Sequence, residues 1–327
     1  MREKSGLQTV SIYEPIQEGL ARVEHGLKNV PTHKFPFLSQ LLGHVFETSG
    51  KRIRPAVTLL AGGFNPHDGK KSEIMATAVE LLHIATLIHD DMVDDSDVRH
   101  GRSTISSLWG RKAAVLVGDY IFAASATYVC ETENIRVIRR FSENIMELST
   151  GELQEMAEAY NCDLTMEQYL DRIYNKTASL LTTAGEAGAV LSGAPEDTVR
   201  VLREYGYNLG MAFQIVDDIL DFESTQEEVG KPVGNDLSLG ILTLPAILAL
   251  ERQPKNNPIA GLFQHPHEEG TLARAVEMIQ NSSVIEESYA VAEKYCRTAL
   301  DALTGLDPNP SRSSLEELVG YVLERRS

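Results

Sequence analysis

The sequence predicts an all-α fold, a large antiparallel helix bundle that forms one domain over residues 1–327. Three observations lead to this prediction. Apolar residues recur at spacings of three and four along most of the chain, no segment alternates apolar and polar residues as a strand does, and Gly, Pro or Asn separates successive helical segments. Because 43% of the residues are hydrophobic, the chain can bury a sizeable core.

The helical segments can be placed one after another by this spacing and by the residues that interrupt it. They are expected over residues 12–30, 35–48, 56–61, 72–95, 113–130, 137–159, 166–191, 195–222, 239–250, 272–280, 288–303 and 313–324.

Local signals fix the ends of the early segments. The first has an apolar stripe at positions 12, 16, 20, 23 and 27 and stops before Pro31. The second ends near Gly50, which opens the break GKRIRP, and Gly62 ends the third. The fourth ends in an acidic cluster and is followed by a basic, Gly-containing loop over residues 98–103. The later segments are bounded in the same way by Gly, Pro or Asn.

Composition excludes several classes of function. The formal net charge of −17, from 30 basic and 47 acidic residues, argues against a nucleic-acid-binding protein. Cys130, Cys162 and Cys296 are odd in number and widely spaced, which is typical of reduced thiols in a cytoplasmic protein. We expect no secretory signal and no membrane span, and the most apolar stretch, residues 113–129, contains Asp119 and is expected to be a buried helix.

Two acidic motifs carry the chemistry. The stretch HIATLIHDDMVDDSDVRHGR contains Asp90, Asp91 and Asp94, and FQIVDDILDF repeats the spacing with Asp217, Asp218 and Asp221. Residues three or four apart share a helix face, so each motif gathers carboxylates that suit a hard cation such as Mg²⁺. A single copy is often only a solvated helix end. Two copies favour a Mg²⁺ site, with six carboxylates around one cavity if the helices face each other, and Mg²⁺ in such sites usually holds a substrate phosphate.

Basic residues outside these motifs are candidates for binding that phosphate. GKRIRP places Lys51, Arg52 and Arg54 in a loop with no acidic partner nearby, which suits a phosphate group, although a solvated basic turn explains it equally well. His83 lies seven residues before Asp90 and so on a similar helix face, where a diphosphate contact and a core histidine are both open. His89 points elsewhere and is interpreted as structural.

Five motifs together resemble the trans-isoprenyl diphosphate synthases. GKRIRP, ELLHIATLIHDDMVDDSDVRHGR, NKTASLL, FQIVDDILDF and GKPVGNDLSLGILTLP occur in the order and character of that family, from about residue 50 to residue 245. The resemblance implies an all-helical isoprenoid synthase fold around a central cavity, usually in a homodimer. It also implies Mg²⁺-dependent head-to-tail condensation of isopentenyl diphosphate onto an allylic diphosphate, with possible peripheral membrane contact during product release.

The resemblance also implies roles for individual residues. Asp90 and Asp94 would bind two Mg²⁺ ions and Asp217 a third, with Asp91, Asp218 and Asp221 completing the motifs. The isopentenyl diphosphate site would contain Lys51, Arg54 and His83. The allylic diphosphate site would contain Arg99, Lys176, Thr177, Gln214 and Lys231, of which Lys176 and Lys231 would assist the departure of diphosphate.

Two positions depart from the family pattern. His100 stands where the family usually has the second of two arginines, so one contact to isopentenyl diphosphate is expected to be weaker or pH-dependent. Ile241 stands where many members carry lysine. Reduced substrate affinity is expected from these departures, with activity retained because the metal motifs are intact.

The residues before the first acidic motif bear on product length. Thr86 lies one helical turn before Asp90, about 6 Å away, and Ala85 is beside it. Short-chain members resemble this chain but carry an aromatic residue there. A long-chain product, heptaprenyl to decaprenyl, is therefore expected for quinone side chains, with Phe141 as a candidate floor of the tunnel.

Other functions stay open. The tunnel could close lower and give a geranylgeranyl or farnesyl product. A terpene cyclase would use one aspartate-rich helix but a different second metal motif, and a non-catalytic subunit of a heteromeric synthase would be expected to lack some of the aspartates present here.

Overall fold

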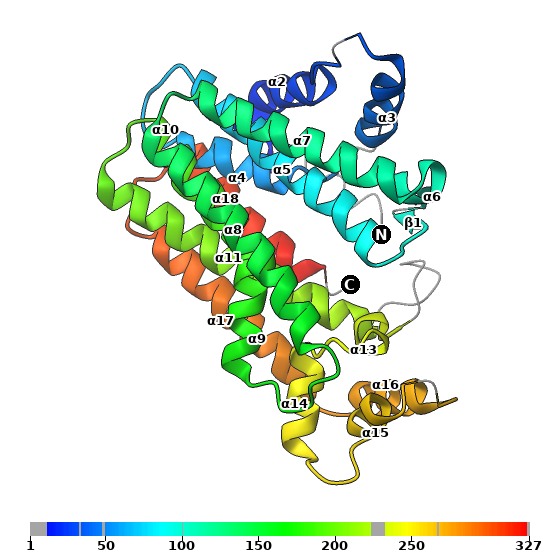
Figure 1. Ribbon diagram of the computed structural model, residues 1–327. Coiled ribbons are helices and arrows are strands. Elements are labelled where there is room, and N and C mark those ends of the chain that lie inside the picture. Colours follow the sequence, from blue (N-terminus) through cyan, green and yellow to red (C-terminus); the bar gives the residue numbers. More distant parts are fainter. Residues whose placement is uncertain are drawn as a thin grey trace. The chain divides into compact units, whose positions relative to one another are not determined.

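The computed structural model describes residues 12–32, 34–47, 50–99, 101–223, 233–266 and 268–325, and within these ranges helices dominate (Figure 1). The only strands in the described ranges form a two-stranded antiparallel hairpin. The all-α fold class expected from the sequence is confirmed.

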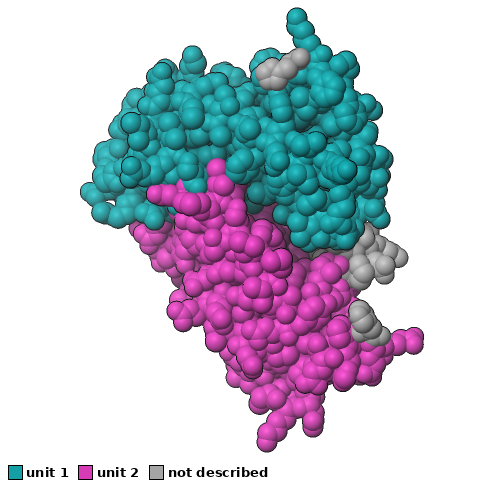
Figure 2. All heavy atoms as spheres, viewed as in Figure 1, with its two compact units in different colours: residues 1–142, 183–203, 305–317 teal, residues 143–182, 204–304, 318–327 magenta. Residues whose placement is uncertain are grey.

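The described chain falls into two compact units, each assembled from separate stretches (Figure 2). The first contains residues 1–142, 183–203 and 305–317, and the second contains residues 143–182, 204–304 and 318–327. The single domain expected from the sequence stays a prediction.

The first unit contains the N-terminal helices and both strands. In chain order these are η1 (Glu14–Ile16), α2 (Gln17–Lys28), α3 (Pro36–Phe46), α4 (Ile53–Gly62), α5 (Lys70–Val93), β1 (Val98–Arg99), β2 (Arg102–Ser103), α6 (Ile105–Trp109) and α7 (Arg111–Glu131). It also takes the first part of α8 (Ile135–Glu158), most of α10 (Ser179–Leu191), and the starts of α11 (Glu196–Glu223) and α18 (Pro310–Glu324).

Helix α5 is the core of the first unit, because it packs against α2, α4 and α7. Most of its residues from Ser72 to Leu82 are buried, and Ala85 and Ile88 continue the buried surface. The approach of α7 is close: a Cβ added at Gly118 would lie 2.1 Å from Nε2 of His89. This contact supports the structural interpretation of His89, whose side chain is used against α7.

The loop expected over residues 98–103 contains the hairpin, which pairs Val98 with Ser103 and Arg99 with Arg102. Thr104 then begins helix α6, since its side-chain oxygen accepts the backbone N–H of Ser107 at 3.2 Å. Helix α6 was not expected from the sequence.

Helix α7 differs from the buried helix expected over residues 113–129. It packs on α5 along one face and exposes apolar residues on the other, such as Leu116 at 68%. Among the described helices, α7 alone has the length and composition needed to cross a membrane. The core helix of a soluble protein can meet the same criteria, so this is weak evidence for a membrane span. The expectation of burial therefore holds for one face of α7 only.

The second unit contains the remaining helices. These are the second part of α8, α9 (Met166–Ile173), the π-helical turn η2 (Tyr174–Ala178), the start of α10, most of α11, α13 (Asn235–Ser238), α14 (Leu244–Arg252), α15 (Pro258–Gln264), α16 (Thr271–Gln280), α17 (Val284–Leu303) and the end of α18.

Several elements of the second unit differ from the sequence prediction, among them the short helix α13, which was not expected. The helix expected over residues 166–191 is interrupted by the π turn η2. The helix expected to start at residue 239 starts at Leu244, because Thr243 is extended and Pro245 occupies the first helical turn. Helix α15 was missed, although its start has a clear signal: the Asn257 side chain accepts the N–H of Ile259 ahead of the helix that Pro258 opens.

Candidate active site

The first acidic motif lies at the C-terminal end of α5. The backbone N–H of Asp94 donates to the carbonyl oxygen of Asp90 at 2.8 Å, so the last helical turn places these residues one above the other. Asp90 is partly exposed and Asp94 is exposed. Both carboxylates can therefore be reached by a ligand.

Asp91 has a different environment from Asp90 and Asp94. It is buried, and Nε of Arg99 in strand β1 donates to its Oδ1 at 2.5 Å. The ion pair fixes Arg99, an expected ligand of the allylic diphosphate, beside the metal motif. The assignment of Asp91 as a metal ligand stays a prediction.

The first turn of α4 meets α5 at His83, because α4 begins at Ile53 and so contains Arg54, which was expected in the loop ahead of a helix over residues 56–61. Nη1 of Arg54 lies 3.1 Å from Nε2 of His83, and the imidazole nitrogen must accept this bond because a guanidinium only donates. Lys51 is exposed. Two of the three residues expected to bind isopentenyl diphosphate are therefore brought together, Arg54 from α4 and His83 from α5, the helix that carries the first acidic motif.

Arg52 was expected to share in a basic cluster with no acidic partner, and this expectation is wrong. Its guanidinium forms ion pairs with Glu24 of α2 and Glu80 of α5. Both partners lie 28 residues away in sequence, so the local pattern around GKRIRP could not reveal them.

The second acidic motif lies in α11, in the other unit, where its three aspartates have different partners. Asp217 forms an ion pair with Arg325 near the end of α18, and the guanidinium carbon of Arg325 lies 4.5 Å from the ring centroid of Phe213. Asp221 accepts the backbone N–H groups of Asn235 and Asp236, each at 3.1 Å, at the start of α13. Both oxygens of Asp221 are therefore used locally, and its role as a metal ligand stays a prediction.

Asp218 is the centre of a buried hydrogen-bond chain. The Tyr169 hydroxyl donates to it at 2.6 Å and the Gln214 amide at 2.7 Å. Gln214 in turn accepts the Thr177 hydroxyl at 2.6 Å. Burial raises the pKa of Asp218 to about 7, against the opposing effect of these donors. The chain joins the NKTASLL and FQIVDDILDF motifs, and the roles of Thr177 and Gln214 at the allylic diphosphate stay predictions.

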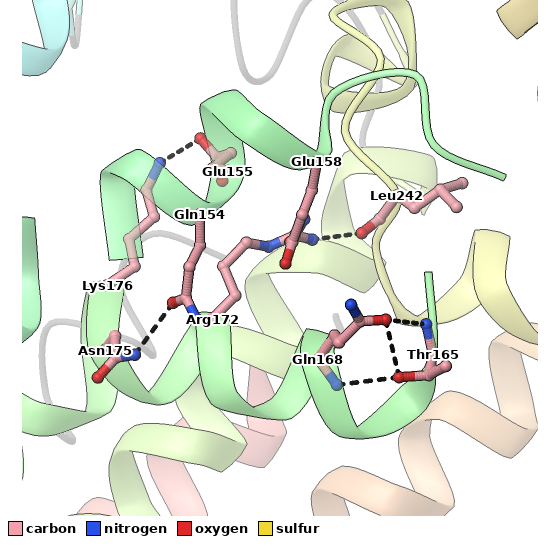
Figure 3. Close-up of polar contacts among 9 residues, drawn as sticks. All are labelled: Gln154, Glu155, Glu158, Thr165, Gln168, Arg172, Asn175, Lys176 and Leu242. Carbon is pink, nitrogen blue, oxygen red and sulfur yellow. Dashed lines mark hydrogen bonds and ion pairs between the residues drawn. The ribbon is translucent and has the colours of Figure 1, made fainter. Parts of the chain in front are cut away.

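Lys176 lies in the π turn η2 and is oriented by α8. Its ammonium group donates to Glu155 at 2.5 Å and to Glu152 at 3.3 Å, and Figure 3 shows Lys176 beside Glu155 while the adjacent Asn175 meets Gln154. The two helical segments are close here, since a Cβ at Gly151 would lie 2.5 Å from the backbone nitrogen of Lys176. Extra turns of this kind occur often at functional sites.

Further polar residues near these motifs were not predicted from the sequence. Arg172 is buried, donates to Glu158 at 3.1 Å and also donates to the carbonyl oxygen of Leu242 (Figure 3), which ties α9 to the segment before α14. Ile241, also in that segment, donates its N–H to the carbonyl oxygen of Asp236. Burial, together with the nearby charges of Asp221 and Asp218, raises the pKa of the Asp236 carboxyl to about 8. The GNDL sequence was the available signal for Asp236, whereas Arg172 had none.

The residues assigned to product length lie in the first unit. Ala85 has 0% exposure, Phe141 is also buried, and Thr86 is half-buried with its hydroxyl donating to the carbonyl oxygen of His83 at 2.8 Å. Ala85 is thus fully packed, and Thr86 retains the accessible surface on this turn of α5. The tunnel assignments stay predictions.

Two expected site residues, His100 and Lys231, lie outside the described residues.

The donor set fits Mg²⁺ bound through a substrate. Asp94 is exposed and Asp90 and Asp217 are partly exposed, Asp217 with Arg325 on one oxygen, and carboxylate oxygen is the ligand type that Mg²⁺ prefers. Within the described part of the chain, no three His, Cys, Asp or Glu side chains converge on one point that could hold a metal ion. Neither motif therefore supplies a complete set of protein ligands for a metal ion. Mg²⁺ usually keeps several water ligands and binds phosphate oxygens of the substrate, so it does not require one.

Comparison with known proteins identifies the family. Residues 35–279 match the family model described as polyprenyl synthetase. The chain belongs to the polyprenyl synthetase family. Heptaprenyl diphosphate synthase component 2 from Geobacillus stearothermophilus is 37% identical over 315 residues, which cover 96% of this chain and 98% of the relative.

Solved structures of the family are similar over almost the whole chain. Heptaprenyl diphosphate synthase from Staphylococcus aureus is 35% identical with a TM-score of 0.92, covering 95% of this chain and 99% of that one. Polyprenyl synthase from Caulobacter crescentus CB15, complexed with calcium and isoprenyl diphosphate, is 31% identical with a TM-score of 0.91, covering 98% of each chain. The chain therefore has the isoprenoid synthase fold and is a trans-prenyltransferase, as the sequence motifs implied.

Proposed function

We propose that this synthase uses Mg²⁺ to condense isopentenyl diphosphate repeatedly onto an allylic diphosphate, giving a long-chain all-trans polyprenyl diphosphate for quinone side chains. The observation that carries the proposal is the hydrogen-bond chain from Thr177 through Gln214 to Asp218, with Lys176 beside it. Two motifs that are distant in sequence are joined there, next to Asp217.

Different side chains are proposed to bind each of the two diphosphates. Arg54, His83 and Lys51 would hold isopentenyl diphosphate by charge-assisted hydrogen bonds. Lys176, Thr177 and the adjacent Gln214 would orient the allylic diphosphate. Fixed positive charge at the leaving group stabilises the transition state as the carbon–oxygen bond ionises.

Three Mg²⁺ ions per active site are proposed, two held by Asp90 and Asp94 and one by Asp217. Bound in this way, the ions would neutralise the departing diphosphate. The allylic cation is then attacked by the double bond of isopentenyl diphosphate and a proton is lost, for which the released diphosphate is the proposed acceptor.

A homodimer in the cytoplasm is proposed as the working form, with peripheral membrane contact during release of the apolar product. In support of a self-associating surface, α8 exposes the large apolar side chains Met146, Leu153 and Met156, at 60 to 71%. Light scattering of the purified protein tests the dimer directly, and flotation with anionic lipid vesicles after turnover tests the membrane contact.

The experiment that tests the function is a product-length assay. Purified protein is incubated with Mg²⁺, farnesyl diphosphate and labelled isopentenyl diphosphate, and the dephosphorylated products are sized by chromatography. Products beyond geranylgeranyl are expected, and omission of Mg²⁺ or of either diphosphate should abolish them.

Other outcomes point to the competing functions. A stop at geranylgeranyl keeps the enzyme class and overturns the long-chain product. Consumption of the allylic diphosphate without isopentenyl diphosphate would indicate a cyclase. No product with any allylic primer would indicate that a second subunit is required.

A further inference from the structure

Arg52 is the member of the GKRIRP loop that faces two carboxylates. Its Nε donates to Oε1 of Glu24 on α2, and its Nη1 donates to Oε1 of Glu80 on α5 at 2.7 Å. The Arg52 side chain is 10% exposed and that of Glu80 only 5%. Glu24 covers the outer side and is 33% exposed. The guanidinium is therefore largely buried within the first unit, and its Nε and Nη1 each donate to a carboxylate.

The backbone at Arg52 needs such an anchor. Its φ of 54° lies in the left-handed region, which residues with a Cβ adopt only when the surrounding structure fixes them there. The neighbouring backbone is also held, because the Tyr13 hydroxyl donates to the carbonyl oxygen of Lys51. A Cβ at Gly50 would lie 3.3 Å from Nη1 of Arg52, so the loop backbone passes directly over the guanidinium.

Helix α5 contacts Arg52, which caps α4, and Arg54, in the first turn of α4, from one face. Glu80 and His83 are three residues apart and so are neighbours on the helix surface. Glu80 accepts from Arg52 and His83 accepts from Arg54, at 3.1 Å. The position of the loop along α5 is thereby fixed by one ion pair on the buried side and one hydrogen bond at the proposed substrate side.

We propose that Arg52 is a positioning residue for isopentenyl diphosphate, clamped by Glu24 and Glu80 so that the loop and the first turn of α4 present Lys51 and Arg54 in binding geometry. The inference rests on the proposed function, because it takes Lys51, Arg54 and His83 as the isopentenyl diphosphate site. Arg52 itself does not contact the substrate in this arrangement.

The alternative is that Arg52 leaves its partners and binds the diphosphate directly. The two models predict opposite signs for loss of the Glu80 charge. If Arg52 is a direct ligand, neutralising Glu80 removes both a competitor and a repulsive charge, so the anion binds more tightly. If Arg52 is an anchor, the same change loosens the loop and the anion binds more weakly.

The test is calorimetric titration of isopentenyl diphosphate alone into wild type and Glu80→Gln, followed by steady-state kinetics with both diphosphates. We expect Glu80→Gln to weaken isopentenyl diphosphate binding about tenfold and to raise its KM in parallel, with the KM of the allylic diphosphate unchanged. Glu24→Gln, at the more exposed partner, should shift both quantities in the same direction by less, and it provides the sign test if Glu80→Gln does not fold.

Arg136→Gln is the matched control. Arg136 also donates to two carboxylates in the first unit, Glu196 at 2.6 Å and Glu186 at 3.2 Å, but it lies on α8 and not in the basic loop. Its replacement should leave isopentenyl diphosphate binding unchanged.

Equal or tighter binding of isopentenyl diphosphate by folded Glu80→Gln, or by Glu24→Gln, overturns the anchor, as does an equal rise in both KM values. These results leave the proposed function standing if wild type still condenses the two diphosphates. Wild-type protein that condenses nothing overturns the proposed function instead.

Discussion

Replacing Gly151 by alanine should damage the allylic site through the backbone of the π turn η2. A Cβ at residue 151 would lie 2.5 Å from the nitrogen of Lys176, 2.9 Å from its Cα and 3.0 Å from the carbonyl carbon of Asn175. Relaxing the shortest of these to an ordinary non-bonded distance requires α8 and η2 to separate by about 1 Å. All three contacts are with backbone atoms, so no side-chain rotation can relieve them.

The size of the effect follows from this displacement. Overpacking costs about 1–3 kcal/mol, and the helical preference of alanine over glycine offsets about 0.5–1 kcal/mol of it. A shift of about 1 Å in a positioning group can cost roughly 100-fold in rate. Gly151→Ala is therefore expected to lower the melting temperature modestly, to lower kcat strongly and to raise the KM of the allylic diphosphate.

The assay is steady-state incorporation of labelled isopentenyl diphosphate with the allylic primer varied, alongside thermal unfolding by circular dichroism. Gly261→Ala in α15 is the control, because no heavy atom lies within 4 Å of its added Cβ, and it should stabilise the protein by about 0.4–1 kcal/mol with unchanged kinetics. A Gly151→Ala enzyme with wild-type kinetics and a raised melting temperature would refute the reasoning.

Four other changes test further residues of the proposed site. Asp90→Asn should lower kcat/KM by roughly 10²–10³-fold and raise the Mg²⁺ concentration needed for half-maximal activity, and a normal Mg²⁺ titration would argue against Asp90 as a ligand. Arg325→Gln removes the guanidinium paired with Asp217 and should tighten Mn²⁺ binding in calorimetry, whereas unchanged affinity would mean that the pair does not compete with the metal. Thr86→Phe should shorten the product without changing the stability of the protein. Ala85→Phe should also shorten the product, but it should lower the free energy of unfolding by about 1–3 kcal/mol because Ala85 is fully packed. Unchanged product lengths in both variants would mean that this turn of α5 does not line the tunnel.

The fold could be predicted from the sequence wherever the signal was local. Helix α5 was expected over residues 72–95 and spans Lys70–Val93, because its apolar run is long and ends in a charged cluster. The start of α14 was misplaced by five residues, since the apolar pattern continues through Leu242, which is not helical. The π turn η2 had no sequence signal, because it changes the hydrogen-bond pattern without changing the apolar spacing.

The site shows the same limit. The motifs identified Thr177, Gln214 and Asp218, which the structure joins in one hydrogen-bond chain. The partners of Arg52 and the pairing of Arg325 with Asp217 could not be predicted, because they depend on tertiary contacts spanning 28 and 108 residues. Sequence patterns therefore predicted which residues carry the chemistry, and only the structure showed which groups contact them.

The position of Asp221 couples metal occupancy to the start of α13. Its two oxygens accept the N–H groups of Asn235 and Asp236, so a cation bound through both oxygens shares each oxygen, which has two lone pairs, with a backbone donor. If the cation weakens these two hydrogen bonds, thermodynamic linkage applies in both directions: the stability that α13 loses equals the binding free energy that the cation loses. Hydrogen exchange at the amides of Asn235 and Asp236 would thus report whether Asp221 has exchanged its role as a helix cap for that of a metal ligand.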